Sequence, residues 1–344
     1  MKQYLFALVI ITFLFPLKVR AQNNQTVTNG DITGTVNFAG TGCIYNWVNN
    51  MPGIGLAASG TGNIGSFTAV NNGGMPVTAT ITATATSGLA YIPNSGSNNV
   101  SVINIANNTV VSSIPVGSEP WGLAISPDGS RVYITNLNSN NVSVINAATN
   151  TVTATIPVGT NPIGAIVSPD GSLLYVTNLN GQSMSVINTK TNAVISTITG
   201  LGGPIGIVAS RDGSKVYVVG AASNTVYVIN TSTNATITTV PVGKGANGIS
   251  ISPDGSRLYV VNGISNTVSV INTLTDALTA TISVGANPAC AVVSPDGGFV
   301  YVTNINDNNI TVINTATNSV TSTIPVSRGS YGISLNSDGS QLYV

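Results

Sequence analysis

The ten carboxylates of the sequence are its best candidates for acid–base chemistry, because the chain contains no histidine. Six of them recur every 42 residues, in Ser-Pro-Asp-Gly turns or close variants: Asp128, Asp170, Asp212, Asp254, Asp296 and Asp338. Proline presets the φ of a turn's second residue, aspartate bonds its own backbone, and glycine accepts positive φ. A structural role in turns is therefore enough to explain these six acids.

Four acids lie outside the repeated turns: Asp31, Glu119, Asp276 and Asp307. Their spacing gives no pair of carboxylates suited to glycoside or lactone hydrolysis, so we predict no catalytic residues and no enzyme. Oxygen ligands suit calcium, but the polar stretch Asn304–Asn309 around Asp307 has Asn and Ser counterparts in the sibling segments. We therefore predict a polar loop there, no metal site and no cofactor.

The two cysteines, Cys43 and Cys290, are far apart in the sequence and fall in different predicted domains. An exported chain could oxidise them, but the spacing favours two separate thiols. Neither cysteine has a basic neighbour in the sequence that would lower its pKa, so neither is predicted to be a nucleophile.

The elements that carry the turn acids repeat with one period throughout the C-terminal part of the chain. Tyrosines recur at intervals of 42 residues at Tyr91, Tyr133, Tyr175, Tyr217, Tyr259, Tyr301 and Tyr343. The second repeat predicts four strands, Gly122–Ser126, Arg131–Thr135, Asn141–Ile145 and Thr151–Val158, rich in the residues that strands prefer. Four antiparallel strands in about 40 residues are the size of a β-propeller blade.

The motifs of this repeat resemble a known family. Tyr175-Val176-Thr177-Asn178, with the Ser-Pro-Asp-Gly and Ser-Val-Ile-Asn motifs, is similar to the YVTN-type β-propeller repeat of microbial surface-layer and secreted proteins. The similarity covers Leu89–Val344 and implies a propeller like the seven-bladed members. The chain departs from the motifs at Pro93, Arg211, Val219-Gly220 and Ser337. Similar propellers include quinoprotein dehydrogenases and lactonases, so an enzyme is the alternative function, although no cluster of charged funnel residues is evident.

We therefore expect an all-β protein with three segments: a signal peptide (1–21), a small β-sandwich module (22–87) and a YVTN-type propeller (88–344). The repeats supply 25 strands where six closed blades need 24. A six-bladed ring would place the Tyr331 strand beside Leu89–Pro93 and leave Gln341–Val344 without a slot. We expect six to seven blades, of which the last is truncated. The sequence would then be a fragment that lacks about one repeat, and its ring would be open or imperfectly closed.

The N-terminal segments indicate export. Lys2 precedes a mostly apolar run, Tyr4–Leu17, which is too short to cross a bilayer. In the module, the candidate strands are Thr33–Phe38, Cys43–Val48, Ser66–Val70 and Val77–Thr84. Tyr45-Asn46-Trp47 and Ile54–Val70 resemble PKD-type immunoglobulin-like modules, which implies a spacer or an adhesive domain.

Topology places the loops between second and third strands, and the loops between blades, at one end of the propeller. These loops differ most from repeat to repeat and carry Glu119, Trp121, Lys244, Arg328 and Tyr331, of which the aromatic and arginine residues are typical interface anchors. This is the predicted binding face; the alternative is that Trp121 and Tyr331 only pack at strand starts.

The predicted function follows from these features together. Basic residues form no run, so nucleic acid is not an expected partner. We expect a secreted or cell-surface monomer without a membrane span, a non-enzymatic scaffold that binds an extracellular protein or glycan. A fragment with no function of its own is a further alternative.

Overall fold

The computed structural model is made of β-strands, and the only helical element within its described residues is one short 3-10 turn, η1 (Pro52–Ile54). It describes residues 11–18, 29–33, 35, 43–61, 64–72, 81–105, 107–327, 329–336 and 339–344. The chain divides into two compact units, mainly Ala90–Ile103 with Val110–Val344, and Phe13–Leu89 with Asn104–Thr109. No helix in the described ranges has the length and hydrophobicity needed to cross a bilayer.

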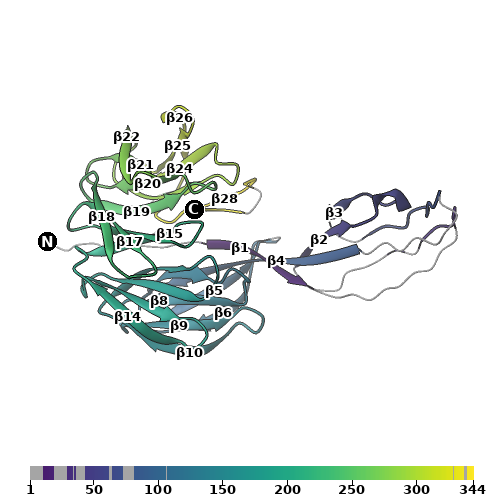
Figure 1. Ribbon diagram of the computed structural model, residues 1–344, viewed down its shortest axis with the longest axis horizontal. Coiled ribbons are helices and arrows are strands. Elements are labelled where there is room, and N and C mark those ends of the chain that lie inside the picture. The colour runs from purple at the N-terminus through teal and green to yellow at the C-terminus, as the bar shows by residue number, and fades with distance from the viewer. Residues whose placement is uncertain are drawn as a thin grey trace. The chain divides into compact units, whose positions relative to one another are not determined.

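Five successive repeats of the larger unit each form one four-stranded antiparallel sheet (Figure 1). The strands are β7 (Pro120–Ile125), β8 (Arg131–Asn136), β9 (Asn141–Asn146), β10 (Thr151–Pro157), β11 (Pro162–Val167), β12 (Leu173–Asn178), β13 (Ser183–Asn188), β14 (Ala193–Thr199), β15 (Pro204–Ala209), β16 (Lys215–Gly220), β17 (Thr225–Asn230), β18 (Thr236–Pro241), β19 (Ala246–Ile251), β20 (Arg257–Asn262), β21 (Thr267–Asn272), β22 (Ala277–Ser283), β23 (Pro288–Val293), β24 (Phe299–Asn304), β25 (Asn309–Asn314) and β26 (Ser319–Pro325). The four strands predicted for the second repeat are confirmed within two residues at each end.

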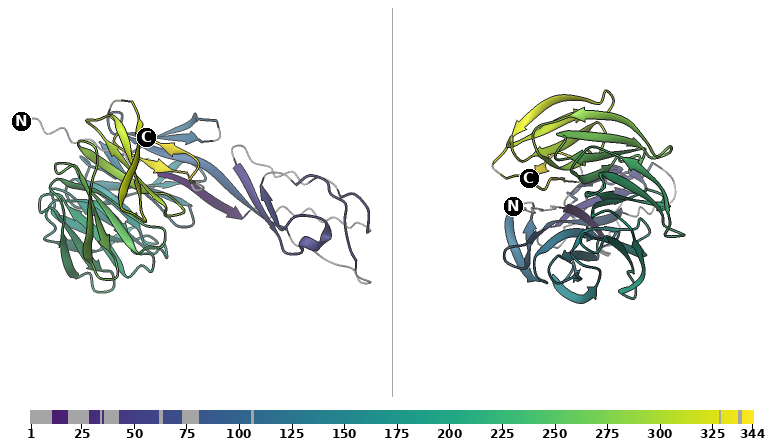
Figure 2. Two further views of the ribbon diagram at one scale, coloured as in Figure 1. Left: turned by 90° about the horizontal axis from the view of Figure 1, so that it is seen from above. Right: turned by 90° about the vertical axis from the view of Figure 1, so that its left-hand side faces the viewer.

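These sheets follow one another around an axis, as the right-hand view of Figure 2 shows. The first strands of neighbouring sheets, β7, β11, β15, β19 and β23, contact one another in sequence order, which makes them the innermost strands. The fourth strands are exposed along most of their length. With the strands of the first repeat, the larger unit is a propeller of six blades, and the predicted all-β propeller fold is confirmed.

Apolar side chains from neighbouring sheets form the core between them. One cluster joins Tyr133 and Val144 of the second repeat to Leu174 and Val176 of the third, and the following blade pairs repeat the arrangement. Because every inner sheet is covered on both faces, its strands are apolar on both faces. Burying each Val, Ile or Leu side chain contributes about 1.5–3 kcal/mol.

A buried threonine forms a hydrogen bond between one blade and the next. Every described innermost strand has an irregular register near its start, between Pro162 and Ala165 in the third repeat, which frees the Gly164 N–H from the ladder. The Thr177 hydroxyl accepts from Gly164 N (2.8 Å) and donates to Ile205 O of the next blade (2.8 Å). Thr135 and Thr303 do the same in their repeats.

In the fourth repeat, two substitutions compensate each other in side-chain volume. Elsewhere a glycine before the innermost strand faces an asparagine, and a Cβ on Gly117 would lie 2.7 Å from the Asn136 side chain. The fourth repeat has Leu201 in place of the glycine and Gly220 in place of the asparagine. Leu201 is buried against its neighbours, so the larger residue occupies the volume that the missing asparagine leaves.

The ends of the repeat array differ from the complete blades. The first repeat contributes the end of β4 (Ile81–Asn94) with β5 (Asn99–Asn104) and β6 (Thr109–Pro115). After β26, strand β27 (Ser334–Leu335) pairs with β28 (Leu342–Tyr343). The pairing of the Tyr331 strand with Leu89–Pro93 is not found among the described strands. The Thr303 hydroxyl instead donates a hydrogen bond to Tyr331 O, as Thr135 and Thr177 donate to a carbonyl of the blade that follows them.

The smaller unit contains one antiparallel sheet, in which β2 (Cys43–Asn49) lies between β3 (Ser59–Thr61) and β4. The predicted strand at Cys43–Val48 is confirmed, whereas Ser66–Val70 is no strand, because only Thr68 forms a bridge, to Ile32. Most of Thr33–Phe38 and part of Val77–Thr84 lie outside the described residues. The sandwich module and the signal peptide both stay predictions. Within the predicted signal peptide, β1 (Ile11–Lys18) pairs with β4.

Candidate functional site

The repeated aspartates are held inside their own turns. In the second repeat, Asp128 accepts hydrogen bonds from Ser126 Oγ (2.6 Å), Ser130 N (3.0 Å) and Ser130 Oγ (2.9 Å). Gly129 takes a positive φ of 71°, a conformation that glycine adopts without strain. The bonds from the first serine hydroxyl and from the backbone N–H recur at Asp170, Asp212, Asp254 and Asp296, while Asp338 lies outside the described residues. Asp296 has no bond from a second serine, because Gly298 stands at that position.

These hydrogen bonds favour the ionised carboxylates. The serine hydroxyl and the backbone N–H of the turn lower the pKa of each described turn aspartate, to about 2 for Asp212 and Asp254. A general acid or base at neutral pH needs a pKa shifted in the opposite direction. The turn aspartates are therefore structural groups, as the sequence predicts.

The remaining acids do not gather into a site. Glu119 has a positive φ of 55° and accepts a hydrogen bond from Asn138. Asp307 accepts from Ala286 N (2.7 Å), and Asp276 forms an ion pair with Lys215 (2.8 Å). Within the described residues, no three Asp, Glu, Cys or His side chains come together as a metal site.

The predicted binding face contains both exposed and buried members. Lys244 is exposed and Glu119 is partly exposed, whereas Arg328 lies outside the described residues. Trp121 is only 4% exposed and packs against Leu137 and Ile163, which favours the alternative that it is a core residue. Binding at this face stays a prediction.

Tyr331 and Cys290 lie close together near the innermost strands. Tyr331 accepts a hydrogen bond from Asn247 Nδ2 (2.8 Å), a residue two repeats earlier. Cys290 is a free thiol that occupies a position where the other repeats have glycine. Burial raises its pKa to about 12, so the thiol stays protonated and is a poor nucleophile. The side chain of Cys43 is outside the described set.

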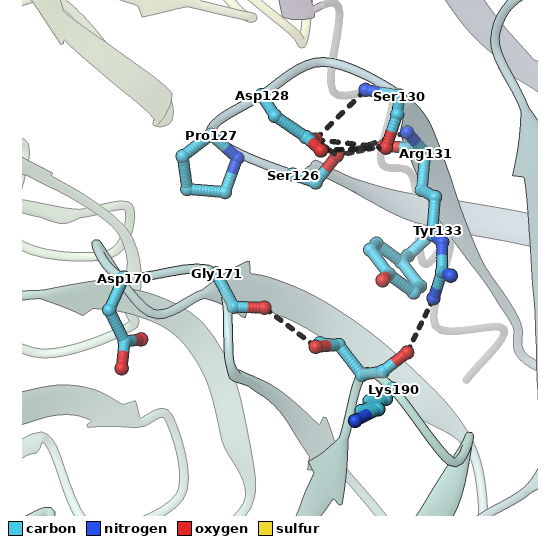
Figure 3. Close-up of a pocket in the computed structure, with 10 residues that line it drawn as sticks. Ser126, Pro127, Asp128, Ser130, Arg131, Tyr133, Asp170, Gly171 and Lys190 are labelled. Carbon is cyan, nitrogen blue, oxygen red and sulfur yellow. Dashed lines mark hydrogen bonds between the residues drawn. The ribbon is translucent and has the colours of Figure 1, made fainter.

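A pocket that sequence reasoning missed lies at the opposite ends of the strands, between the second and third blades (Figure 3). Its volume is about 350 Å³, and the residues that bear on its chemistry are Asp128, Arg131, Tyr133, Asp170, Thr189 and Lys190. The Arg131 guanidinium reaches across the blade boundary and donates to Thr189 O. Figure 3 shows Tyr133 with its hydroxyl directed into the space between the two turns.

The same positions two repeats later form a second pocket of about 350 Å³. There Lys215 replaces Arg131, and its ammonium donates to Thr273 O (3.2 Å) and to the Asp276 carboxylate (2.8 Å). In successive repeats this position holds Arg131, Leu173, Lys215, Arg257 and Phe299. A basic residue at a position where two other repeats have leucine or phenylalanine is the sequence signal that could have found the pockets.

Comparisons with known proteins agree with this architecture. A model of the seven-bladed β-propeller lactonases matches residues 166–328, and a model of YNCE-like β-propellers matches residues 49–181. The chain is a β-propeller protein. No curated protein matches the sequence.

Solved structures share the propeller fold. Hydrazine synthase of Kuenenia stuttgartiensis superposes with a TM-score of 0.67 at 19% identity, over 75% of this chain and 89% of that chain. A functionally unknown protein from Desulfotomaculum acetoxidans DSM 771 gives 0.66 at 19% identity, over 74% and 88%. At this identity the likeness is one of fold, and the function of this propeller has to be argued from its own residues.

Proposed function

We propose that the protein is an exported, non-enzymatic propeller that binds a protein or glycan outside the cell. One observation carries this proposal: each described turn aspartate has its carboxylate bonded by a serine hydroxyl and a backbone N–H of its own turn. Five of the chain's ten carboxylates are thus committed to shaping the turns.

The basic residues of the turn surface support the same proposal. Arg131, Lys215 and Arg257 each donate to a backbone carbonyl of the following blade. Rigid blades with short, exposed polar turns present a surface suited to recognition. Export agrees with the predicted signal peptide, residues 1–21, and with solubility that rests on Asn, Ser and Thr when only 6% of residues are charged.

The alternative function is lactone hydrolysis, which the match of residues 166–328 to the lactonase model favours. The two functions make different predictions for the four acids outside the turns. A lactonase that uses a carboxylate as its general acid or base requires at least one of Asp31, Glu119, Asp276 and Asp307, or a turn aspartate, to act on the substrate. A binding protein does not.

The deciding experiment measures hydrolysis and binding on the same preparation of residues 22–344. We expect no hydrolysis of aldonolactones or acyl-homoserine lactones above the buffer rate, and retention of the protein on immobilised extracellular polysaccharide or surface protein. Turnover that disappears on replacing one of the four acids by its amide would overturn the proposal. Lys244→Ala and Glu119→Gln, both at exposed or partly exposed positions, test whether the predicted loop face takes part.

A further inference from the structure

The Arg131 pocket contains buried polar groups without partners. In the first repeat, Tyr91 donates to Asn150 Oδ1 (2.9 Å). The equivalent residues one repeat later are Tyr133 and Asn192, and neither the Tyr133 hydroxyl nor Asn192 Oδ1 has a hydrogen-bond partner. The Tyr259 hydroxyl and Asn318 Oδ1, three repeats further on, are unpartnered in the same way. Tyr133 is fully buried, and a buried polar group without a partner is costly. The wall of the Arg131 pocket therefore contains a polar group that the chain leaves unsatisfied.

The second pocket shows what kind of group that is. Asp276 is the repeat equivalent of Asn192, 84 residues later, and its carboxylate pairs with Lys215 at 2.8 Å. The second pocket thus contains its own anion beside the cation. In the first pocket, Arg131 has no carboxylate partner in the described structure, because Asn192 stands where the acid would be.

The charged groups of the first pocket that are free to bind are hydrogen-bond donors. Arg131 has five N–H donors, of which one is bonded to Thr189 O. Lys190 is exposed at the pocket, where the second pocket has Leu274. The carboxylates of Asp128 and Asp170 are already bonded to their own serines. Two cationic donors, Arg131 and Lys190, therefore face a ligand that must accept.

Hydroxyl groups around these donors favour a sugar over a simple acid. Ser130 Oγ and Thr189 Oγ1 use their protons on Asp128 and on Gly171 O (2.6 Å), which leaves their lone pairs free to accept. A ligand with a carboxylate for Arg131 and neighbouring hydroxyls for these oxygens matches both sets of groups. The volume of about 350 Å³ accommodates one or two sugar units.

We propose that the pocket between the second and third blades binds the carboxylate of an acidic sugar unit in an extracellular glycan. This inference rests on the proposed function and names its ligand class. Arg131 and Lys190 hold the carboxylate. Since Asp128 and Asp170 lie nearby and oppose the anion, each single unit binds weakly.

The test titrates digalacturonate into the whole protein by calorimetry, with its methyl ester and a Glu-Glu dipeptide as comparison probes. Arg131→Leu introduces the residue that Leu173 already provides at this repeat position. Asn192→Asp supplies the internal carboxylate that the second pocket has in Asp276. The matched control is Arg257→Leu. The Arg257 site has the same type of bond to the next blade and the same unpartnered Tyr259 and Asn318, but it has Ala316 in place of Lys190, so it lacks the second cation.

We expect the acid to bind the native protein and the ester and the dipeptide to bind at least about tenfold more weakly. Arg131→Leu and Asn192→Asp should each weaken acid binding about tenfold, the loss expected for one charge-assisted hydrogen bond. Arg257→Leu should change it less than about twofold. Circular dichroism of each variant confirms folding.

Three results would overturn the pocket assignment: equal binding of acid and ester, dipeptide binding as tight as the sugar acid, or unchanged binding in Asn192→Asp. If an acidic glycan binds but Arg131→Leu and Asn192→Asp do not affect it, the pocket is wrong while the proposed function stands. If no extracellular glycan or surface protein binds at all, the proposed function itself fails.

Discussion

Replacing Thr177 by valine should destabilise the propeller without changing its shape. The Thr177 side chain is fully buried and makes two hydrogen bonds of 2.8 Å, one within its blade and one to Ile205 O of the next. Valine has nearly the same volume, and Val219 and Val261 occupy the equivalent positions of two other repeats. The substitution therefore removes the bonds and little else.

The magnitude follows from the groups left behind. An intramolecular hydrogen bond contributes about 1 kcal/mol net, and a buried donor or acceptor without a partner costs about 1–3 kcal/mol. The additional buried methyl group returns about 1 kcal/mol. We expect Thr177→Val to lower the free energy of unfolding by about 2 kcal/mol, or the melting temperature by about 4 °C in a domain of this size.

Urea unfolding and amide hydrogen exchange measure the two parts of this prediction. The unfolding midpoint reports the loss of stability, and the Gly164 amide, which bonds to the Thr177 hydroxyl, should exchange faster in the variant. Val261→Thr is the matched control, because it adds a hydroxyl where the carbonyl of the following blade is in the same position. It should cost nothing or stabilise slightly.

A change below about 0.5 kcal/mol in Thr177→Val, with unchanged exchange at Gly164, would refute the reasoning. It would mean that the threonine bond does not hold neighbouring blades together. Equal losses in Thr177→Val and Val261→Thr would point instead to a general intolerance of substitution at this position.

Three further predictions follow from other described residues. Gly117→Leu or Asn136→Gly alone should each cost about 1–3 kcal/mol in urea unfolding, and the double variant should lose less than their sum, as the fourth repeat implies. Asp254 has a pKa lowered to about 2 in the folded protein, so its ionised form stabilises the fold above the unfolded pKa of about 3.9. This stabilisation is lost as the pH falls from about 4 to 2. In Asp254→Asn the urea midpoint of unfolding should therefore decrease less over the same pH range. In a Cys43→Ser protein at pH 8, Cys290, with a pKa of about 12, should react with a thiol reagent only slowly until the protein is unfolded.

Most of the propeller could be predicted from the sequence because its information is local and repeated. The interval between Tyr91 and Tyr133 sets the blade length, and the turn chemistry around Asp128 sets where strands end. Trp121 could not be assigned in the same way. An aromatic side chain at a strand start serves an interface or a core equally well, and only the packing against Leu137 and Ile163 decides.

The candidate pocket depends on contacts between neighbouring repeats, which the repeat alone does not specify. Arg131 bonds a carbonyl 58 residues later, and its importance comes from the groups that face it, Tyr133 and Lys190. The sequence does show that Asn192 is replaced by Asp276 at the equivalent position two repeats later. This difference can be interpreted only from the structure, where Asp276 forms an ion pair with Lys215.

A carboxyl-detected NMR titration of the aspartates tests the central claim most directly. If the propeller's acids serve as turn locks, every described turn aspartate titrates below the ordinary value of about 3.9, with Asp212 and Asp254 near 2. A turn aspartate that titrates between about pH 5 and 7 would contradict the account, because such a group is poised for proton transfer.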